Sequence, residues 1–318
     1  ESTGKIMLTR KRSLDAREHP RRIVMQFELG DGTTMPGVGF GTFQIPEAEA
    51  EAPVAMALNA GYRHIDTAEM YANSAAIGRA IKSSGIKREE LFITTKVSGS
   101  NTFDATLAFC QRAITELGMA QVDLVLIHTA FGGKEVRLAK YRGLVEAQRR
   151  GLTRSIGVSN FDVKHLEELA AEGLPLPAAN QLELHPLNQK RELLKYMSAR
   201  KILPIAYSSL APLSSWRAGY SAFGGSKAAD STVTIESPIA AMAMRNGVSE
   251  AQLMLRYALQ KGWPILPKSV REDRIRNNFD VNSFTISDED MRELDAMDCD
   301  AAFAFGNEKK PVDPCKAD

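Results

Sequence analysis

Residues 63–71 read RHIDTAEMY, where a short apolar run ends on the carboxylate of Asp66 and Tyr71 follows five residues later. An aspartate is rarely buried without a partner, so the question is which group pairs with Asp66. His64 precedes it by two residues and would share its strand face, which makes an H-x-D metal site one interpretation. No further cluster of acids and histidines in the sequence supports that interpretation, so we expect no metal here.

Other polar side chains also end short apolar runs, which recur roughly every 30 residues from Met35 onward. Eight such runs occur: MPGVGFGT, RHIDT, LFITTK, DLVLIH, SIGVSN, ANQLELH, LPIAYS and WPILPKS. Segments with the apolar spacing of helices lie between them, and several close on a glycine, which favours a helix end. These glycines are Gly61, Gly118, Gly173 and Gly262.

Continuously apolar strands that are each followed by a helix indicate a parallel sheet covered on both faces. Eight strand–helix units predict an α/β fold with a closed (β/α)8 TIM barrel rather than an open sheet. The carboxyl ends of the strands of such a barrel gather on one face, and that face carries the active site. Polar residues at these strand ends should therefore converge: Asp66, Lys96, His128, Asn160, His185, Ser208 and Lys268. Asp66 can then take its partner from the next strand.

The ends of the chain and one long gap differ from this repeat. Residues 1–22 are basic and poor in apolar side chains, and we expect a disordered, solvated tail. Asp31 and Gly32 lie between two apolar stretches, which predicts a β-hairpin at the start of a single barrel domain over residues 23–300. Residues 211–234 are rich in Gly, Ser and Ala and predict a long loop over the barrel mouth.

Composition limits the class of protein. The 318 residues are 44% hydrophobic and 25% charged with a formal net charge of +1, as in ordinary soluble enzymes. The balanced charge argues against nucleic acid or an anionic membrane as a partner, and no apolar run reaches the ~20 residues of a membrane-spanning helix. Three widely spaced cysteines favour free thiols in the reducing cytoplasm. We expect a monomer or a weak dimer.

Three glycines near the start of the barrel, Gly37, Gly39 and Gly41, suggest a dinucleotide-binding fingerprint. The third glycine is one residue early, and no acidic residue ends a second strand about 20 residues later, as the Rossmann pattern requires. We interpret them as a tight first strand whose backbone can come close to a cofactor.

Several long motifs together resemble the aldo-keto reductase family. They are GYRHIDTAEMYAN, GLTRSIGVSNF, AANQLELHP and ILPKSVREDRI, in the family's order and spacing over roughly residues 26–300. The resemblance implies reversible hydride transfer between NADPH and the carbonyl group of a small molecule. The family's catalytic tetrad corresponds to Asp66, Tyr71, Lys96 and His128.

These four residue types suit carbonyl reduction, because the negative charge that develops on the oxygen needs a proton donor and electrostatic stabilisation. On the family's pattern Tyr71 gives the proton, and Lys96 favours the phenolate because a cation within about 4–6 Å lowers the pKa of a phenol. Asp66 would hold Lys96 and offset the cost of burying its ammonium group, which makes Lys96 the expected partner of Asp66. His128 would orient the carbonyl.

The resemblance also implies the cofactor and substrate contacts. Residues expected to bind NADPH or NADP+ are Thr42, Asp66, Ser159, Asn160, Gln181, Tyr207, Ser208, Leu210, Lys268, Ser269, Arg274 and Asn278. Of these, Lys268, Ser269 and Arg274 would bind the 2′-phosphate, which favours NADPH over NADH. The expected substrate contacts are Phe43, Tyr71, His128, Thr129, Phe131 and Trp216. The tail over residues 301–318 would line the pocket through Phe303 and Phe305, as C-terminal loops of the family do.

The sequence departs from the common family pattern at Ser74, Ser209, Asn277 and residues 129–130, and the last change alters the wall of the substrate pocket. IHTAFGGKE and YSSLAPL resemble a fungal branch of the family that reduces α-dicarbonyls, keto-amides and conjugated polyketones. Two other functions stay open: a lyase that forms a Schiff base on Lys96, and a non-catalytic NADP(H)-binding sensor.

Overall fold

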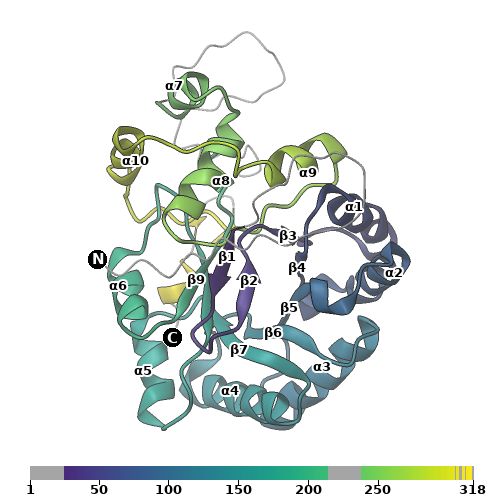
Figure 1. The fold of residues 1–318 in the computed structure, drawn as a ribbon. Coiled ribbons are helices and arrows are strands. Elements are labelled where there is room, and N and C mark those ends of the chain that lie inside the picture. Colours follow the sequence, from purple (N-terminus) through teal and green to yellow (C-terminus); the bar gives the residue numbers. More distant parts are fainter. Residues whose placement is uncertain (1–24, 214–237, 305, 308–309, 312, 317–318) are drawn as a thin grey trace.

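The computed structural model describes residues 25–213, 238–304, 306–307, 310–311 and 313–316. At its centre, seven parallel strands follow one another in chain order around a curled sheet (Figure 1). They are β3 (Gly39–Gly41), β4 (His64–Asp66), β5 (Phe92–Val97), β6 (Val122–Ile127), β7 (Thr153–Ser159), β8 (Ala179–Glu183) and β9 (Leu203–Tyr207). The strands are buried almost throughout, as expected for a parallel sheet with helices on its outer face.

The eighth expected strand is reduced to isolated bridges at Ile265. This residue bridges Val38 on one side and Ala206 on the other, so the two edges of the seven-stranded sheet meet there. Pro264 and Pro267 lie on either side of it and have no N–H to donate, so they can only accept. The Pro264 carbonyl accepts from the Ala206 amide at 2.7 Å and the Pro267 carbonyl from the Gly41 amide at 3.1 Å. The expected TIM barrel is therefore confirmed, with its last strand shortened to a seam at Ile265.

Helices alternate with the strands, as the apolar spacing predicted. They are α1 (Glu47–Ala60), η1 (Glu69–Tyr71), α2 (Ser74–Ser84), η2 (Arg88–Glu90), α3 (Phe103–Glu116), α4 (Gly133–Arg149), α5 (Val163–Ala171) and α6 (Arg191–Ala199). Gly61 ends α1 with φ 111°, and Gly118 follows α3 with φ 66°. Glycine adopts this left-handed conformation at little cost, so the predicted helix ends are confirmed at these positions.

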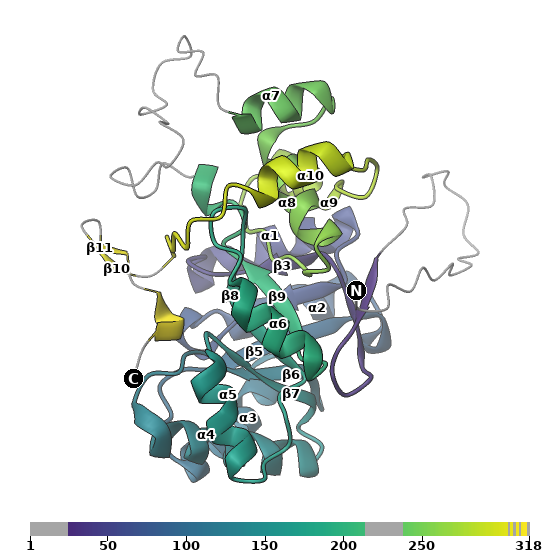
Figure 2. The same ribbon diagram turned by 90° about the vertical axis from the view of Figure 1, so that its left-hand side faces the viewer.

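The remaining elements follow β9. They are η3 (Ala211–Leu213), α7 (Pro238–Arg245), α8 (Glu250–Gln260), α9 (Glu272–Phe279), α10 (Asp288–Asp295), β10 (Gly306–Asn307), β11 (Lys310–Pro311) and η5 (Pro314–Lys316). Helices α7 to α10 lie together at one end of the molecule (Figures 1 and 2). The predicted tail over residues 1–22, most of the predicted long loop with Trp216, and Phe305 lie outside the described residues.

The expected N-terminal hairpin is confirmed, since β1 (Gln26–Glu28) pairs in antiparallel fashion with β2 (Thr34–Pro36). The amide of Gly30 donates to the carbonyl of Ala178, just before β8, at 2.9 Å. Figure 2 shows the hairpin on the opposite side of the molecule from β10 and β11. The hairpin therefore closes the end of the barrel where the strands begin, and the opposite end remains for the site.

The tight first strand is explained by close packing at two glycines. A Cβ on Gly37 would lie 2.4 Å from the Phe27 ring, and one on Gly39 would lie 2.6 Å from both the His64 ring and the Leu266 side chain. At these two positions the protein's own side chains, rather than a cofactor, leave no room for a Cβ.

Within the described part of the chain, no helix has the length and apolarity to cross a membrane. No group of three or more His, Cys, Asp or Glu side chains there could hold a metal ion. Cys110, Cys299 and Cys315 are free thiols, and the first and last are buried.

Candidate active site

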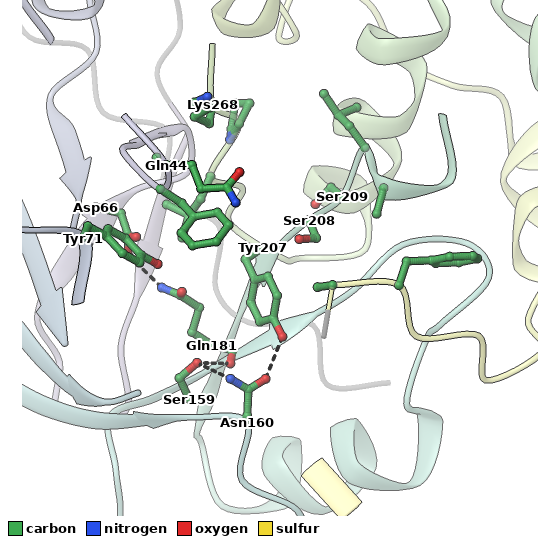
Figure 3. Close-up of a pocket in the computed structure, with 18 of the residues that line it drawn as sticks. Gln44, Asp66, Tyr71, Ser159, Asn160, Gln181, Tyr207, Ser208, Ser209 and Lys268 are labelled. Carbon is green, nitrogen blue, oxygen red and sulfur yellow. Dashed lines mark hydrogen bonds between the residues drawn. The ribbon is translucent and has the colours of Figure 1, made fainter. Parts of the chain in front are cut away.

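A cavity of about 630 Å³ opens at the end of the barrel where the strands finish (Figure 3). Most residues that the sequence predicted for the site line this cavity. They are Phe43, Asp66, Tyr71, His128, Ser159, Asn160, Gln181, Tyr207, Ser208, Leu210, Lys268 and Phe303. Of the seven polar strand ends expected to converge, Asp66, His128, Asn160, Ser208 and Lys268 line the cavity, whereas Lys96 and His185 do not.

Asp66 and Lys96 form a buried ion pair beneath the cavity. The Lys96 Nζ lies 2.5 Å from one carboxylate oxygen of Asp66 and also donates to the Thr67 carbonyl at 2.9 Å. The Gln181 side-chain amide donates to the other carboxylate oxygen at 2.8 Å. Burial acts to lower the pKa of Lys96, but Asp66 and Tyr71 outweigh burial, so this pKa is raised and the lysine is charged. The expected partner of Asp66 is confirmed.

Tyr71 ends the short helix η1, which follows β4 closely and so brings the phenol beside the ion pair. The Lys96 Nζ lies 5.2 Å from the centre of the Tyr71 ring, and the Phe43 ring packs on Tyr71 at a centroid distance of 5.2 Å. Burial raises the pKa of Tyr71, and Lys96 acts in the opposite direction. The effect of Lys96 therefore has the expected sign, but burial outweighs it, and Tyr71 keeps its proton at neutral pH.

His128 directly follows β6 and faces Tyr71 at a centroid distance of 5.7 Å. Its Nδ1 lies 2.8 Å from the hydroxyl of Ser98, the residue that follows β5. Burial lowers the pKa of His128 to about 3, with help from the charges of Lys96 and Lys140. The imidazole is therefore neutral at physiological pH and carries one ring proton.

Hydrogen bonds join the ends of β7, β8 and β9 along one wall of the cavity (Figure 3). The Tyr207 hydroxyl donates to the Asn160 side-chain oxygen at 2.8 Å, and the Asn160 amide donates to the Ser159 hydroxyl at 3.0 Å. Ser159 in turn donates to the Gln181 carbonyl at 2.8 Å. Asn160 and Ser208 have φ values of 61° and 53°, a left-handed conformation that is uncommon for non-glycine residues.

Lys268 lies across the cavity from Ser159 and Asn160 in Figure 3 and is exposed. The cavity thus has amide and hydroxyl groups at one end and a cation at the other. The described residues of the expected set that do not line the cavity are Thr42, Lys96, Thr129, Phe131, Ser269, Arg274 and Asn278. Trp216 lies outside the described residues.

Thr42 has a structural contact instead, because its hydroxyl donates to the backbone carbonyl of Asp66 at 2.9 Å. The neighbouring Asn73 is fully buried and donates to the carbonyls of Thr42 and Ile45, both at 3.0 Å. These bonds fix the turns after β3 and β4 against each other. They hold the segment that carries Tyr71.

His185, another polar strand end, makes a structural contact and does not line the cavity. Its Nε2 lies 3.1 Å from Glu183, and both side chains are buried. Glu183 also accepts from the backbone amides of Phe303 at 2.6 Å and Ala304 at 3.0 Å. We call residues 301–304 the C-terminal strap. Phe303 lines the cavity, as predicted, because Glu183 holds the strap at the barrel mouth.

A sequence model described as the Aldo/keto reductase family matches residues 29–298. The chain belongs to the aldo/keto reductase family. It is therefore related to oxidoreductases that act on carbonyl compounds. The resemblance seen in the motifs is confirmed, whereas the assignment to a fungal branch stays a prediction.

Several aldo/keto reductases are similar to this one over most of their length. An aldo-keto reductase of Mycolicibacterium smegmatis is 38% identical over 271 residues, which cover 85% of this chain and 92% of that protein. The methylglyoxal reductase DkgA of Escherichia coli is 35% identical over the same shares of the two chains. The crystal structure of a Bombyx mori aldo-keto reductase in complex with NADP matches with a TM-score of 0.75 and 30% identity, covering 86% of this chain and 92% of that one.

Sequence reasoning missed several residues of this aldo/keto reductase site. Gln44, Met70 and Ser209 line the cavity, and the buried Ser209 hydroxyl has no hydrogen-bond partner among the described residues. Ser98 contacts His128 without lining the cavity. It directly follows the apolar run LFITTKV, so the strand-end rule would have found it had the run been extended by one residue.

Proposed function

We propose that this aldo/keto reductase reduces an aldehyde or ketone to an alcohol with NADPH, and that Tyr71 donates the proton. The observation that carries the proposal is the buried Asp66–Lys96 ion pair beside the protonated phenol of Tyr71 at the floor of the cavity. Burying an ammonium group costs free energy unless the group is paired. Here Asp66 pairs with Lys96 and keeps it beside the Tyr71 phenol, the group that would lose a proton.

The roles of the four side chains follow from their surroundings. Tyr71 would donate its proton to the carbonyl oxygen, and Lys96 would stabilise the phenolate left behind, because a nearby cation favours the charged form of a phenol. Asp66 positions Lys96 through the ion pair. His128 is neutral and beside Tyr71, so it can direct a hydrogen bond at the carbonyl oxygen without adding a charge.

The residues around the cavity fit a nicotinamide dinucleotide. Ser159, Asn160 and Gln181 supply amide and hydroxyl groups at the end near Tyr71, and Tyr207 offers a ring in the same wall. Ser208 and the unpartnered hydroxyl of Ser209 lie toward the middle. When bound, NADPH would supply the hydride. The family relative with bound NADP in its crystal structure supports the same cofactor here.

The preference for NADPH over NADH would come from cations near the last strand. Lys268 is exposed at the rim of the cavity, and Arg274 is exposed on α9. A lysine and an arginine suit a phosphate, one as a point charge and the other as a planar pair of donors. We infer that these side chains bind the 2′-phosphate of NADPH.

The substrate class that we favour is a small α-dicarbonyl. The similar E. coli protein carries the name methylglyoxal reductase, and methylglyoxal has two adjacent carbonyl groups. The fungal branch that the motifs IHTAFGGKE and YSSLAPL resemble also acts on α-dicarbonyls. The two lines of comparison thus point to the same functional group.

The lyase alternative fits the site less well. A lysine that forms a Schiff base must lose its proton to act as a nucleophile. Lys96 is fully buried, donates to both Asp66 and Thr67, and has a raised pKa. Borohydride trapping with a carbonyl substrate, followed by mass measurement, would label Lys96 only in a lyase.

The decisive experiment is a panel of carbonyl compounds followed by NADPH absorbance, including α-diketones, methylglyoxal, isatin and aromatic aldehydes. Tyr71→Phe removes the proton donor while keeping the ring against Phe43, so it should abolish turnover and leave NADPH binding nearly unchanged in a fluorescence titration. Full turnover in Tyr71→Phe would refute the assignment. Absence of turnover by the wild type across the panel would instead favour the NADP(H)-binding sensor.

A further inference from the structure

Ser98 holds the one ring nitrogen of His128 that points away from the proposed chemistry. It follows β5 directly, and its hydroxyl lies 2.8 Å from the Nδ1 of His128. The ends of β5 and β6 are also joined through the backbone, because the His128 amide donates to the Val97 carbonyl at 3.0 Å. With Nδ1 engaged, Nε2 is the nitrogen left for the cavity that His128 lines.

The backbone of Ser98 is fixed by two charged side chains. Its amide donates to Glu69 at 2.8 Å, and Glu69 also accepts from the next amide, that of Gly99, at 3.0 Å. The Ser98 backbone carbonyl accepts from the Nζ of Lys140, a buried residue of α4, at 3.3 Å. All three polar groups of Ser98 are therefore engaged, so its hydroxyl has a defined position rather than a free rotor near His128.

Glu69 is itself anchored and connects this position to Tyr71. Its second carboxylate oxygen lies 2.7 Å from the guanidinium of Arg112 on α3. Glu69 opens η1 and Tyr71 closes it, so one carboxylate holds the segment of the phenol against the loop of Ser98. Glu69 thus helps to position both the Tyr71 phenol and, through Ser98, the His128 imidazole.

The direction of the Ser98–His128 hydrogen bond decides what the imidazole can do. A neutral imidazole has one N–H and one acceptor nitrogen, and the hydrogen bond made by one nitrogen sets the state of the other. A carbonyl oxygen can only accept, so His128 can orient it only with the proton on Nε2. Among the described residues, Ser98 Oγ has no other hydrogen-bond partner, which leaves its proton available for Nδ1.

We propose that Ser98 is a positioning residue that donates to Nδ1 of His128 and so fixes the tautomer with Nε2–H directed into the cavity. This inference rests on the proposed carbonyl reduction for its catalytic consequence, but the tautomer is a property of the protein alone. Ser98 touches neither the cavity nor the reacting atoms. It acts through His128.

The first test is the state of the imidazole, read by ¹⁵N NMR on the full-length chain labelled at histidine. The chain has five histidines, and the signals that disappear in His128→Gln assign this one. The wild type should show Nε2 protonated and Nδ1 accepting a hydrogen bond. In Ser98→Ala the Nδ1 signal should move to that of a nitrogen that accepts none, and Ser98→Thr should restore it. A wild-type Nδ1–H tautomer, or a His128 spectrum unchanged in Ser98→Ala, overturns the proposal.

The second test is kinetic. Ser98→Ala should lower kcat/KM for the best carbonyl of the panel by about tenfold, the effect expected of one hydrogen bond, while Ser98→Thr stays near the wild type. Ser100→Ala in the same loop is the matched control and should change neither readout. If the wild type reduces no carbonyl, the proposed function fails while the NMR comparison still decides the role of Ser98.

Discussion

Lys96 and Asp66 show how a buried charge becomes useful at the scale of single residues. Both side chains are nearly inaccessible to solvent, and each makes more than one hydrogen bond. Desolvating two ions costs several kcal/mol per ion, so such a pair is weak evidence for stability and stronger evidence for a function. The pair also explains why an apolar run ends on Asp66, because the carboxylate compensates the buried ammonium group of Lys96.

The neutral state of His128 predicts a pH dependence of stability. Its folded pKa of about 3 lies below the ordinary value of 6.5, so the unfolded chain binds this proton more readily. Stability from this residue is therefore complete above about pH 6.5 and is lost as the pH falls toward 3, by about 1 kcal/mol between pH 7 and 5.5. Urea unfolding at these two pH values should show a smaller loss in His128→Gln than in the wild type. Equal losses would contradict a buried neutral imidazole.

Lys268 should discriminate between the two nicotinamide cofactors. Lys268→Met removes a cation from the rim of the cavity, and the loss of one charge-assisted hydrogen bond should weaken NADPH binding roughly tenfold or more. NADH lacks the 2′-phosphate and should bind almost as before. Fluorescence titration with each cofactor measures the ratio, with the exposed Lys82→Met on α2 as control. Equal losses for both cofactors would remove the argument for phosphate recognition.

At the scale of elements, strand ends and helix ends could be predicted because they follow local rules. The glycines after α1 and α3 adopt the left-handed conformation that ends a helix. Asp66 ends β4 and His128 follows β6, and the barrel geometry alone brings the two side chains to the same cavity. The shortened eighth strand could have been foreseen from Pro264 and Pro267, which were present in the run WPILPKS. The apolar pattern did not predict the shortening, because it records hydrophobicity and not the backbone N–H donors that prolines lack.

Contacts between loops could not be predicted in the same way. The carboxylate of Glu69 bridges the turn after β4 and the turn after β5, and its partner Arg112 lies 43 residues away in sequence. No periodicity relates such positions, since each loop takes its own path. For the same reason the sequence did not predict that the Thr42 hydroxyl donates to the backbone carbonyl of Asp66. The fold and the strand-end positions of Asp66, Lys96 and His128 follow from the apolar pattern, whereas the supporting contacts depend on the particular side chains.

The C-terminal strap supports a prediction at this scale. Glu183 accepts two backbone amides of the strap, so Glu183→Gln weakens both contacts by removing the charge. Phe303 should then leave the cavity wall more often, and KM for carbonyl substrates should rise several-fold while kcat changes little. Steady-state kinetics measures this split, with the exposed Glu167→Gln on α5 as control. A fall in kcat at constant KM would show that the strap supports chemistry rather than substrate binding.

For the whole molecule, the seam at Ile265 is the place where the barrel closes. Ile265 is fully buried and bridges both edges of the sheet, so the seven strands depend on it to form a closed wall. Ile265→Ala should lower the free energy of unfolding by about 2–5 kcal/mol, the range for deleting a large buried aliphatic side chain. Val270→Ala, at a side chain that is 48% exposed, should have little effect. Denaturant unfolding followed by circular dichroism compares them, and equal effects would show that the seam does not limit stability.

The anchoring of Ser98 reaches the outside of the molecule. The Arg112 side chain is 51% exposed on α3, yet it pairs with Glu69, which holds the loop that touches His128. Dissolved salt can compete for this guanidinium group, because exposed charges are screened strongly and buried charges much less. On the proposed role of Ser98, a substitution at Arg112 on the outer helical layer should therefore alter the rate of carbonyl reduction without changing any residue that lines the cavity.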